Sequence, residues 1–307
     1  MGQFGGGGAV GGTRAGIARG GTHPGTQPPA GSEPGSGPKP ERRRGAPPTL
    51  LQAMPRVLIV RTGSTAPEIQ REHGDYDRWF RSALVGHDVT FDICDAMRAP
   101  IPDLSPYAGV LVTGSVKSIL APEAWMDGLA AFLRGAAGQG VPVLCVCFGC
   151  QALAHARGGR VVQSPAGWEI GAVEVNLTNA ARLDPLFEGL PSPLPVLATH
   201  EDRVETLPPG AVLLAGNDSA PIQAFRAGER LWGVQFHPEA TPAILRELIL
   251  LRRDRLEAGA RERGVDPGRH IDGLLKGLDL FDPRPARRLL ANFTRLCRRE
   301  PEPTRVM

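Results

Sequence analysis

The sequence predicts an α/β protein with an open, mostly parallel sheet covered by helices on both faces. Short continuous apolar runs, such as Arg56–Val60 and Val141–Val146, are typical of strands that are buried on both sides. Segments of helical period lie between such runs, and this alternation is the pattern of parallel sheets. No stretch of about 18 apolar residues occurs, so we expect no membrane-spanning helix.

In the first half of the folded part, each element follows from its local pattern. A proline at the first turn and glycines at the end predict a helix over 122–140. Glycines also end the helix predicted over 150–159. The strands predicted here are 56–60, 87–93, 107–115 and 141–146, and the helices are 76–84, 122–140 and 150–159.

The second half predicts a mostly antiparallel region that continues or flanks the sheet. Its strand-like runs, joined by short turns, are 171–178, 195–199, 211–216, 220–228 and 230–236. Apolar residues then recur at helical spacing over 241–264 and again over 284–299. We therefore expect a main domain at 54–245 and a C-terminal helical extension at 246–300.

The N-terminal segment, residues 1–53, differs from the rest in composition. It holds 15 Gly and 8 Pro, and Phe4 is its only aromatic residue. Such a segment buries too little apolar surface to offset the entropy of ordering, so we expect it to be disordered. Its formal charge is +4, whereas residues 54–307 carry −1. Because the folded part has no basic excess, nucleic-acid binding is not expected.

Three of the five cysteines lie within six residues, at Cys145, Cys147 and Cys150. Structural zinc needs four ligands, usually from paired CxxC units, and the sequence has no second cluster, so we expect no metal and no other cofactor. A disulfide between neighbours on a strand would be strained. Few cysteines in a long chain suit a reducing compartment, so we expect free thiols and a cytoplasmic protein.

Cys147 stands in the setting of a nucleophile. A buried strand, a sharp turn, Gly149 and a helix follow one another, which is the order of a nucleophile elbow. The N-terminal end of a helix favours the thiolate form of a cysteine held there. Gly149 gives the tight turn its space. Cys145 inside the strand and Cys150 in the first helical turn fit the role of small packing residues.

A cysteine nucleophile needs a base, and the base needs an orienting group. His237 ends the strand predicted at 230–236, and Pro238 stops strand pairing there. Glu239 is close enough in sequence to fold back onto the imidazole and fix its tautomer. These three residue types together predict a cysteine hydrolase or transferase.

The segments that carry these residues resemble a known family. "CVCFGCQ" is similar to the G-x-C-x-G-x-Q motif of the class I (triad-type) glutamine amidotransferases, and "GVQFHPE" is similar to their His-x-Glu motif. "LVTGS" resembles their oxyanion strand, and "THEDRV" resembles their His-x-Asp-x-Val segment. The resemblance covers about Arg56–Glu239 and is strongest to free-standing members similar to the glutaminase domain of GMP synthase. Cys145 replaces the usual glycine, and Cys150 stands where histidine is common.

This resemblance implies a flavodoxin-like fold and a catalytic triad. Cys147 would attack the side-chain amide of glutamine, and His237 would act as general base and then protonate departing ammonia. Glu239 would orient His237. A cysteinyl thioester would form and be hydrolysed to glutamate.

The resemblance also implies substrate contacts. The backbone N–H groups of Phe148 and of Ser115, beside Gly114, would hold the oxyanion, and Gln151 would contact the substrate. Trp168 and Glu169 resemble a family loop that can line the substrate pocket, and a loop aromatic beside a strand is as often a packing residue. We expect His200 to be structural. The arginines of Arg252–Arg255 are expected on a solvated helix face.

Two other functions stay open. One is a γ-glutamyl hydrolase or peptidase on the same scaffold, and the other is a non-catalytic binding protein that keeps the fold. The sequence shows no P-loop after Glu239, so we expect any ammonia-accepting synthetase to be a separate partner or to have been lost.

Overall fold

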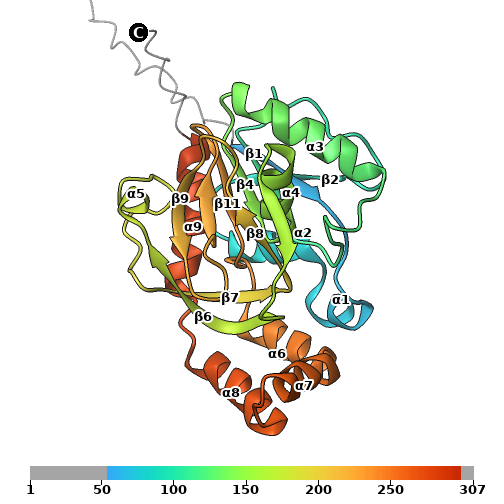
Figure 1. The fold of residues 1–307 in the computed structure, drawn as a ribbon. Coiled ribbons are helices and arrows are strands. Elements are labelled where there is room, and N and C mark those ends of the chain that lie inside the picture. The colour runs from blue at the N-terminus through green and yellow to red at the C-terminus, as the bar shows by residue number, and fades with distance from the viewer. Residues whose placement is uncertain (1–53, 299–307) are drawn as a thin grey trace, which may run out of the picture. The chain divides into compact units, whose positions relative to one another are not determined.

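The computed structural model describes residues 54–298, and the segment 1–53, for which we predicted disorder, lies outside these residues, as do 299–307. A nine-stranded sheet forms the centre of the described part (Figure 1). Its strands in spatial order are β2 (Thr90–Asp95), β1 (Arg56–Arg61), β3 (Gly109–Val112), β4 (Val143–Val146), β11 (Leu231–Val234), β10 (Ala224–Arg226), β9 (Val212–Gly216), β6 (Glu169–Leu177) and β7 (Leu194–His200).

The sheet has a parallel part and an antiparallel part. Strands β2, β1, β3, β4 and β11 pair in parallel. Strands β10, β9, β6 and β7 extend the sheet in antiparallel pairs beyond β11. Both predictions from the sequence, a parallel first half and an antiparallel continuation, are confirmed.

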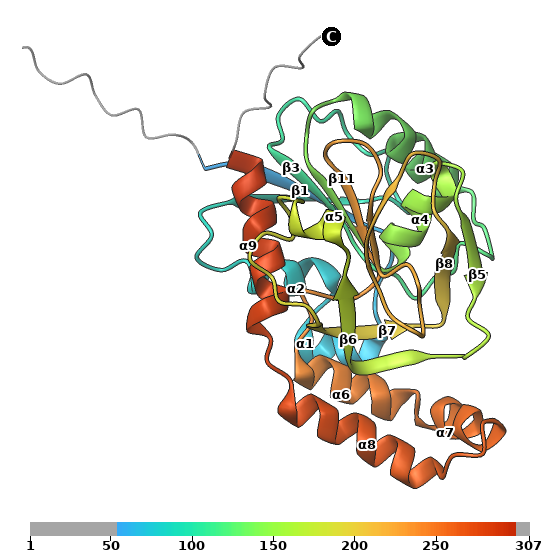
Figure 2. The same ribbon diagram turned by 60° about the vertical axis from the view of Figure 1, so that its left-hand side comes forward.

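Helices cover both faces of the parallel part, as predicted. Helices α3 (Trp125–Gly135) and α4 (Phe148–Ala156) lie on one face, and α2 (Tyr76–Ala83) and α9 (Arg284–Arg298) lie on the other (Figure 2). The four central residues of β1 are apolar because the strand is buried on both faces. Val57 and Ile59 pack into the core beneath α2 and α9, whereas Leu58 and Val60 pack into the core beneath α3 and α4.

The structure corrects several predicted helices. The helix expected from Pro122 begins at Trp125, and its end is a separate 3-10 turn, η1 (Ala136–Gly138). The single helix expected over 241–264 is two helices, α6 (Pro242–Leu251) and α7 (Arg253–Glu262). Arg252 separates them with φ −99° and ψ 8°, so the chain leaves helical geometry at this one residue.

Other elements were not predicted. They are α1 (Pro67–His73), β5 (Arg160–Gln163), α5 (Asn179–Arg182), β8 (Asp202–Thr206) and α8 (Pro267–Leu280). Strands β5 and β8 form a separate two-stranded sheet. Helix α8 did carry a start signal, because Asp266 caps it by accepting from the N–H of Arg269 at 2.8 Å and Pro267 occupies its first turn.

The C-terminal helices divide into two groups. Helices α6, α7 and α8 lie beyond β6 and β7, where α6 and α8 contribute to a core of their own with α1 and α2 (Figures 1 and 2). Helix α9 returns to the main sheet and fills one of its faces. Helix α6 crosses residue 245, and the domain division at that residue stays a prediction. Within residues 54–298, no helix has both the length and the apolar character needed to cross a bilayer.

Candidate active site

Three neighbouring parallel strands carry the predicted catalytic segments to one edge of the sheet. Cys147 directly follows β4, Gly114 lies two residues beyond β3, and His237 lies three residues beyond β11. The carboxyl ends of parallel strands form the usual binding edge of an α/β sheet. Strand pairing continues into the site, because the N–H of Cys147 donates to the carbonyl of Val234 at 2.8 Å.

The backbone of Cys147 has the conformation of a nucleophile elbow. Its φ is 51° and its ψ is −107°, a region that non-glycine residues rarely adopt. The residue occupies the N-cap position of α4, and its side chain makes no capping hydrogen bond. The strained turn lifts the thiol out of the strand and holds it at the end of the helix dipole.

Gly149 is required for a reason that differs from the predicted one. Its φ is not positive, so the turn itself does not demand glycine. A Cβ at this position would lie 2.8 Å from the carbonyl oxygen of Val112 and 3.1 Å from that of Thr113. Glycine therefore lets the first turn of α4 pack directly on the end of β3.

His237 and Glu239 form a buried pair. The Nδ1 of His237 donates to the Oε1 of Glu239 at 2.7 Å, and the exposed fractions of the two residues are 3% and 2%. The Nε2 of His237 has no hydrogen-bond partner among residues 54–298. Burial lowers the pKa of His237, but the charges of Glu239 and Cys147 outweigh it and raise that pKa to about 10. The pair therefore favours the protonated imidazole of His237.

The loop after β3 lies close to both His237 and Cys147. A Cβ at Gly114 would lie 3.0 Å from the Cε1 of His237 and 3.6 Å from the Cβ of Cys147. The hydroxyl of Ser115 fixes this loop by donating to the carbonyl of Thr62 at 2.8 Å and by accepting from the N–H of Lys117 at 3.1 Å.

The two predicted oxyanion donors are not hydrogen-bonded to any other described residue. Within residues 54–298, the backbone N–H groups of Ser115 and Phe148 make no hydrogen bond. Both residues line the same cavity as Cys147. Such N–H groups are available to hold the negative oxygen of a tetrahedral intermediate.

Gln151 and His200 are polar residues that line the cavity together with Cys147. The Nε2 of Gln151 donates to the carbonyl of Asp202 at 2.8 Å and to the Oε1 of Gln235 at 3.2 Å, which leaves its own oxygen for a ligand. His200 bonds to the buried carboxylate of Glu169 at 2.7 Å. His200 and Gln151 both line the cavity, whereas Glu169 lies behind His200.

The other two cysteines of the cluster lie in the core. Cys145 and Cys150 are both completely buried. Burial raises the pKa of each thiol, so both stay protonated and unreactive near neutral pH. This environment fits the packing role expected for them.

The site opens into a cavity of about 450 Å³. This volume lies within the range of small-molecule sites. Among the predicted residues, Cys147, His237, Ser115, Phe148 and Gln151 line it, and so does the loop residue Trp168. Gly114 and Glu239 do not line the cavity, but both lie next to His237, which does. Sequence reasoning missed Tyr76, Trp79, Lys117, Asp202 and Arg252 as lining residues.

Arg252 contradicts the expectation of a solvated helix face. Its guanidinium lies 4.7 Å from the centre of the Trp168 ring, and its Nη1 lies 3.3 Å from the Oγ1 of Thr199. The break between α6 and α7 turns this side chain into the cavity. Its neighbour Arg253 is exposed and pairs with Glu257 at 2.8 Å, which agrees with the expected solvated helix face.

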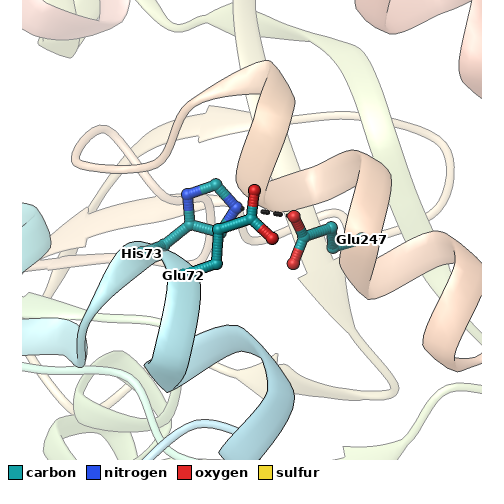
Figure 3. Close-up of side chains that lie close together, drawn as sticks. All are labelled: Glu72, His73 and Glu247. Carbon is teal, nitrogen blue, oxygen red and sulfur yellow. Dashed lines mark hydrogen bonds and ion pairs between the residues drawn. The ribbon is translucent and has the colours of Figure 1, made fainter.

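A second group of potential ligands lies away from the cavity, between α1 and α6. Ligand atoms of Glu72, His73 and Glu247 lie within 4.8 Å of one another (Figure 3). The Nε2 of His73 lies 2.8 Å from the Oε1 of Glu247. This contact ties α6 to α1 and so helps to fix the helix that leads to Arg252.

Comparisons with known proteins agree with the fold. Residues 78–251, more than half of the chain, match the family model described as glutamine amidotransferase class-I. The chain is 34% identical over 158 residues to a GMP synthase [glutamine-hydrolyzing] of Thermosipho africanus, covering 51% of this chain and 28% of that protein. It is 26% identical over 205 residues to gamma-glutamyl peptidase 5 of Arabidopsis thaliana, covering 65% of this chain and 82% of that protein. The chain thus spans about a quarter of the synthase.

Solved structures are similar over most of the chain. A glutamine amidotransferase of Thermotoga maritima superimposes with a TM-score of 0.61 at 22% identity, over 80% of this chain and 99% of that one. A glutamine amido transferase of Methylobacillus flagellatus superimposes with a TM-score of 0.61 at 27% identity, over 80% and 96%. The first shows the fold alone. With the motifs, the strand order and the family match, the chain belongs to the class-I glutamine amidotransferase family.

Proposed function

We propose that the protein hydrolyses the γ-amide bond of a γ-glutamyl compound through a cysteinyl thioester. One observation carries the proposal. The strained turn of Cys147 lies against the Gly114 loop and beside the buried His237–Glu239 pair. Nucleophile, base, orienting acid and oxyanion donors are the parts that acyl transfer requires.

The reaction follows from these positions. The thiolate of Cys147 attacks the γ-carbonyl carbon, and the N–H groups of Ser115 and Phe148 hold the resulting oxyanion. The imidazolium of His237 gives its Nε2 proton to the leaving amine, and the thioester remains on the protein. Water then attacks the thioester while His237 takes its proton. Glutamate leaves and the thiolate returns.

Glutamine is the first candidate substrate, with glutamate and ammonia as products. If the ammonia is used in synthesis, the partner would be a synthetase, as the similarity to the glutamine-hydrolyzing GMP synthase suggests. A γ-glutamyl peptide is the second candidate. It is supported by the similarity to gamma-glutamyl peptidase 5, at 26% identity over 205 residues.

The test measures glutamate release by the full chain from L-glutamine and from γ-glutamylglycine. Cys147→Ala should abolish release, because no other group in the site can form the thioester. Cys150→Ala is the matched control, since it removes a buried sulfur near the same turn and should keep most of the activity. Mass spectrometry of the quenched parent should find the thioester on Cys147. Equal rates for Cys147→Ala and the parent would remove this cysteine from the mechanism.

A further inference from the structure

We propose that Arg252 binds a carboxylate of the substrate and so restricts the pocket to γ-glutamyl compounds that carry this negative charge. The inference rests on the proposed function, because it assigns part of the same pocket. The carboxylate has two possible sources. It is either the α-carboxylate of the γ-glutamyl group or a carboxylate on the leaving group.

Thr199 shows how close the arginine lies to the reacting atoms. Its backbone oxygen is 4.0 Å from the Sγ of Cys147, and its Oγ1 is 3.3 Å from the Nη1 of Arg252. A single residue therefore separates the nucleophile from the guanidinium. Glutamine and γ-glutamyl dipeptides both carry a carboxylate within a few bonds of the scissile carbonyl, which suits this separation.

The charge of Arg252 has no acidic partner in the described protein. Two other charged groups at the cavity have their own partners, since Lys117 pairs with Glu123 at 2.7 Å and Asp202 accepts from the hydroxyl of Ser118. Within residues 54–298, neither Arg252 nor Arg255 forms an ion pair, although both line the cavity. Burial lowers the pKa of Arg252, the charges of Tyr76 and Cys147 oppose this effect, and the charge of Arg255 adds to it. A bound carboxylate would supply the missing opposite charge.

The guanidinium is held in place before any ligand arrives. Its face lies over the ring of Trp168, and the helix that precedes it is anchored by buried Leu248 and Ile249. The contact between His73 and Glu247 adds a second anchor for that helix. A planar guanidinium fixed on an aromatic ring offers its edge to a carboxylate in the two-bond geometry that arginine favours.

The test measures binding by calorimetry in the full-length Cys147→Ala protein, where turnover cannot interfere. Two ligand pairs differ only in one charge: L-glutamine against its α-amide, and γ-glutamylglycine against γ-glutamylglycinamide. With Arg252 present, the carboxylate form should bind roughly 10- to 100-fold more tightly in at least one pair. Arg252→Gln should remove this preference in the same pair. The ligand pair for which the variant no longer prefers the carboxylate form identifies the carboxylate that the arginine binds.

Arg253→Gln is the matched control, because Arg253 is the next residue, is exposed and pairs with Glu257 outside the cavity. It should keep the full preference. Arg252→Lys should restore only part of it, since lysine keeps the charge but not the planar fork. In the active protein, Arg252→Gln should raise KM far more than it lowers kcat.

Three outcomes would overturn the proposal. They are an undiminished preference in Arg252→Gln, an equal loss of affinity for both members of each pair, and an Arg252-containing protein that binds neither member of either pair. Because binding is read without turnover, a parent that binds glutamine with the predicted preference but releases no glutamate rejects the proposed reaction and not the role of Arg252.

Discussion

The strand edge formed by β3, β4 and β11 and the helical arm formed by α6, α7 and α8 both reach the cavity, but they contribute in different ways. The strand edge acts through its backbone, with a strained turn at Cys147, a close loop at Gly114 and two free N–H groups. The helical arm contributes side chains, chiefly Arg252 at a break between two helices. In the proposed reaction, the chemistry would depend mainly on main-chain geometry, whereas substrate choice would depend on a side chain that can be exchanged.

The largest effect that sharpens this comparison is expected at His237. His237→Ala removes the base, so kcat should fall roughly 10²- to 10⁴-fold for every substrate alike. Glu239→Gln keeps the base and weakens only its orientation, so its loss should be smaller. Steady-state kinetics with L-glutamine and γ-glutamylglycine check both variants. If the fall in kcat of His237→Ala depended on the charge of the substrate, the strand edge would also contribute to substrate choice. That result would contradict the division of roles between the strand edge and the arm.

Gly114→Ala tests the backbone contribution without replacing a predicted catalytic side chain. The added methyl would lie 3.0 Å from the Cε1 of His237, so the imidazole must shift. A small displacement in an active site can cost roughly 10²-fold in rate, and we expect kcat to fall by about this factor. Gly128→Ala is the matched control, because its Cβ meets nothing within 4 Å on exposed α3. It should leave kcat unchanged. An unaffected kcat in Gly114→Ala would contradict the tight loop.

The pH dependence of stability tests the charge pair at the strand edge. The pKa of His237 is raised to about 10 in the folded protein, from an ordinary value of 6.5. The folded state thus holds this proton more tightly, which stabilises it below pH 6.5, and the contribution is lost as the pH rises through about 10. The free energy of unfolding of the parent should therefore fall towards that of His237→Ala over this window. Urea titrations of both proteins at pH 6.5 and 9.5 measure the difference, and a constant gap would count against the pair.

The smallest effect is expected in the arm, at the contact between α1 and α6. Glu247→Gln removes the partner of His73, and half-buried surface pairs contribute about 1 kcal/mol or less. Thermal unfolding should detect this loss, while kcat stays near that of the parent. Glu72→Gln is the control, because Glu72 is exposed, lies in the same group and makes no hydrogen bond within residues 54–298 (Figure 3). A large fall in kcat for Glu247→Gln would mean that the arm also shapes the chemistry.

Sequence reasoning reached the strand edge because its signals are local. Cys147, Gly114 and His237 each follow a short apolar run directly, and neighbouring parallel strands bring such positions together. The structure brings these residues together, while their catalytic roles stay predictions.

The arm was harder to predict for physical reasons. No Gly or Pro marks the break at Arg252, and apolar residues at helical spacing continue from Leu248 to Leu256. Nothing in the local pattern therefore distinguishes an inward arginine from the exposed ones beside it. Strands β5 and β8 were missed because their pairing joins distant segments with an irregular register, which period-based reasoning does not detect.

The position of α9 has a consequence for how the chain is made. This helix packs against β3 so closely that a side chain at Gly109 would collide with Cys297, and it covers the face that includes β1, the first strand of the described part. When the ribosome has released all the predicted catalytic residues, it has therefore not yet made the helix that covers this face of the sheet. Until residue 298 emerges, an apolar face stays open to chaperones and to other nascent chains. The predicted catalytic residues are thus translated well before the helix that completes the core beneath their strands.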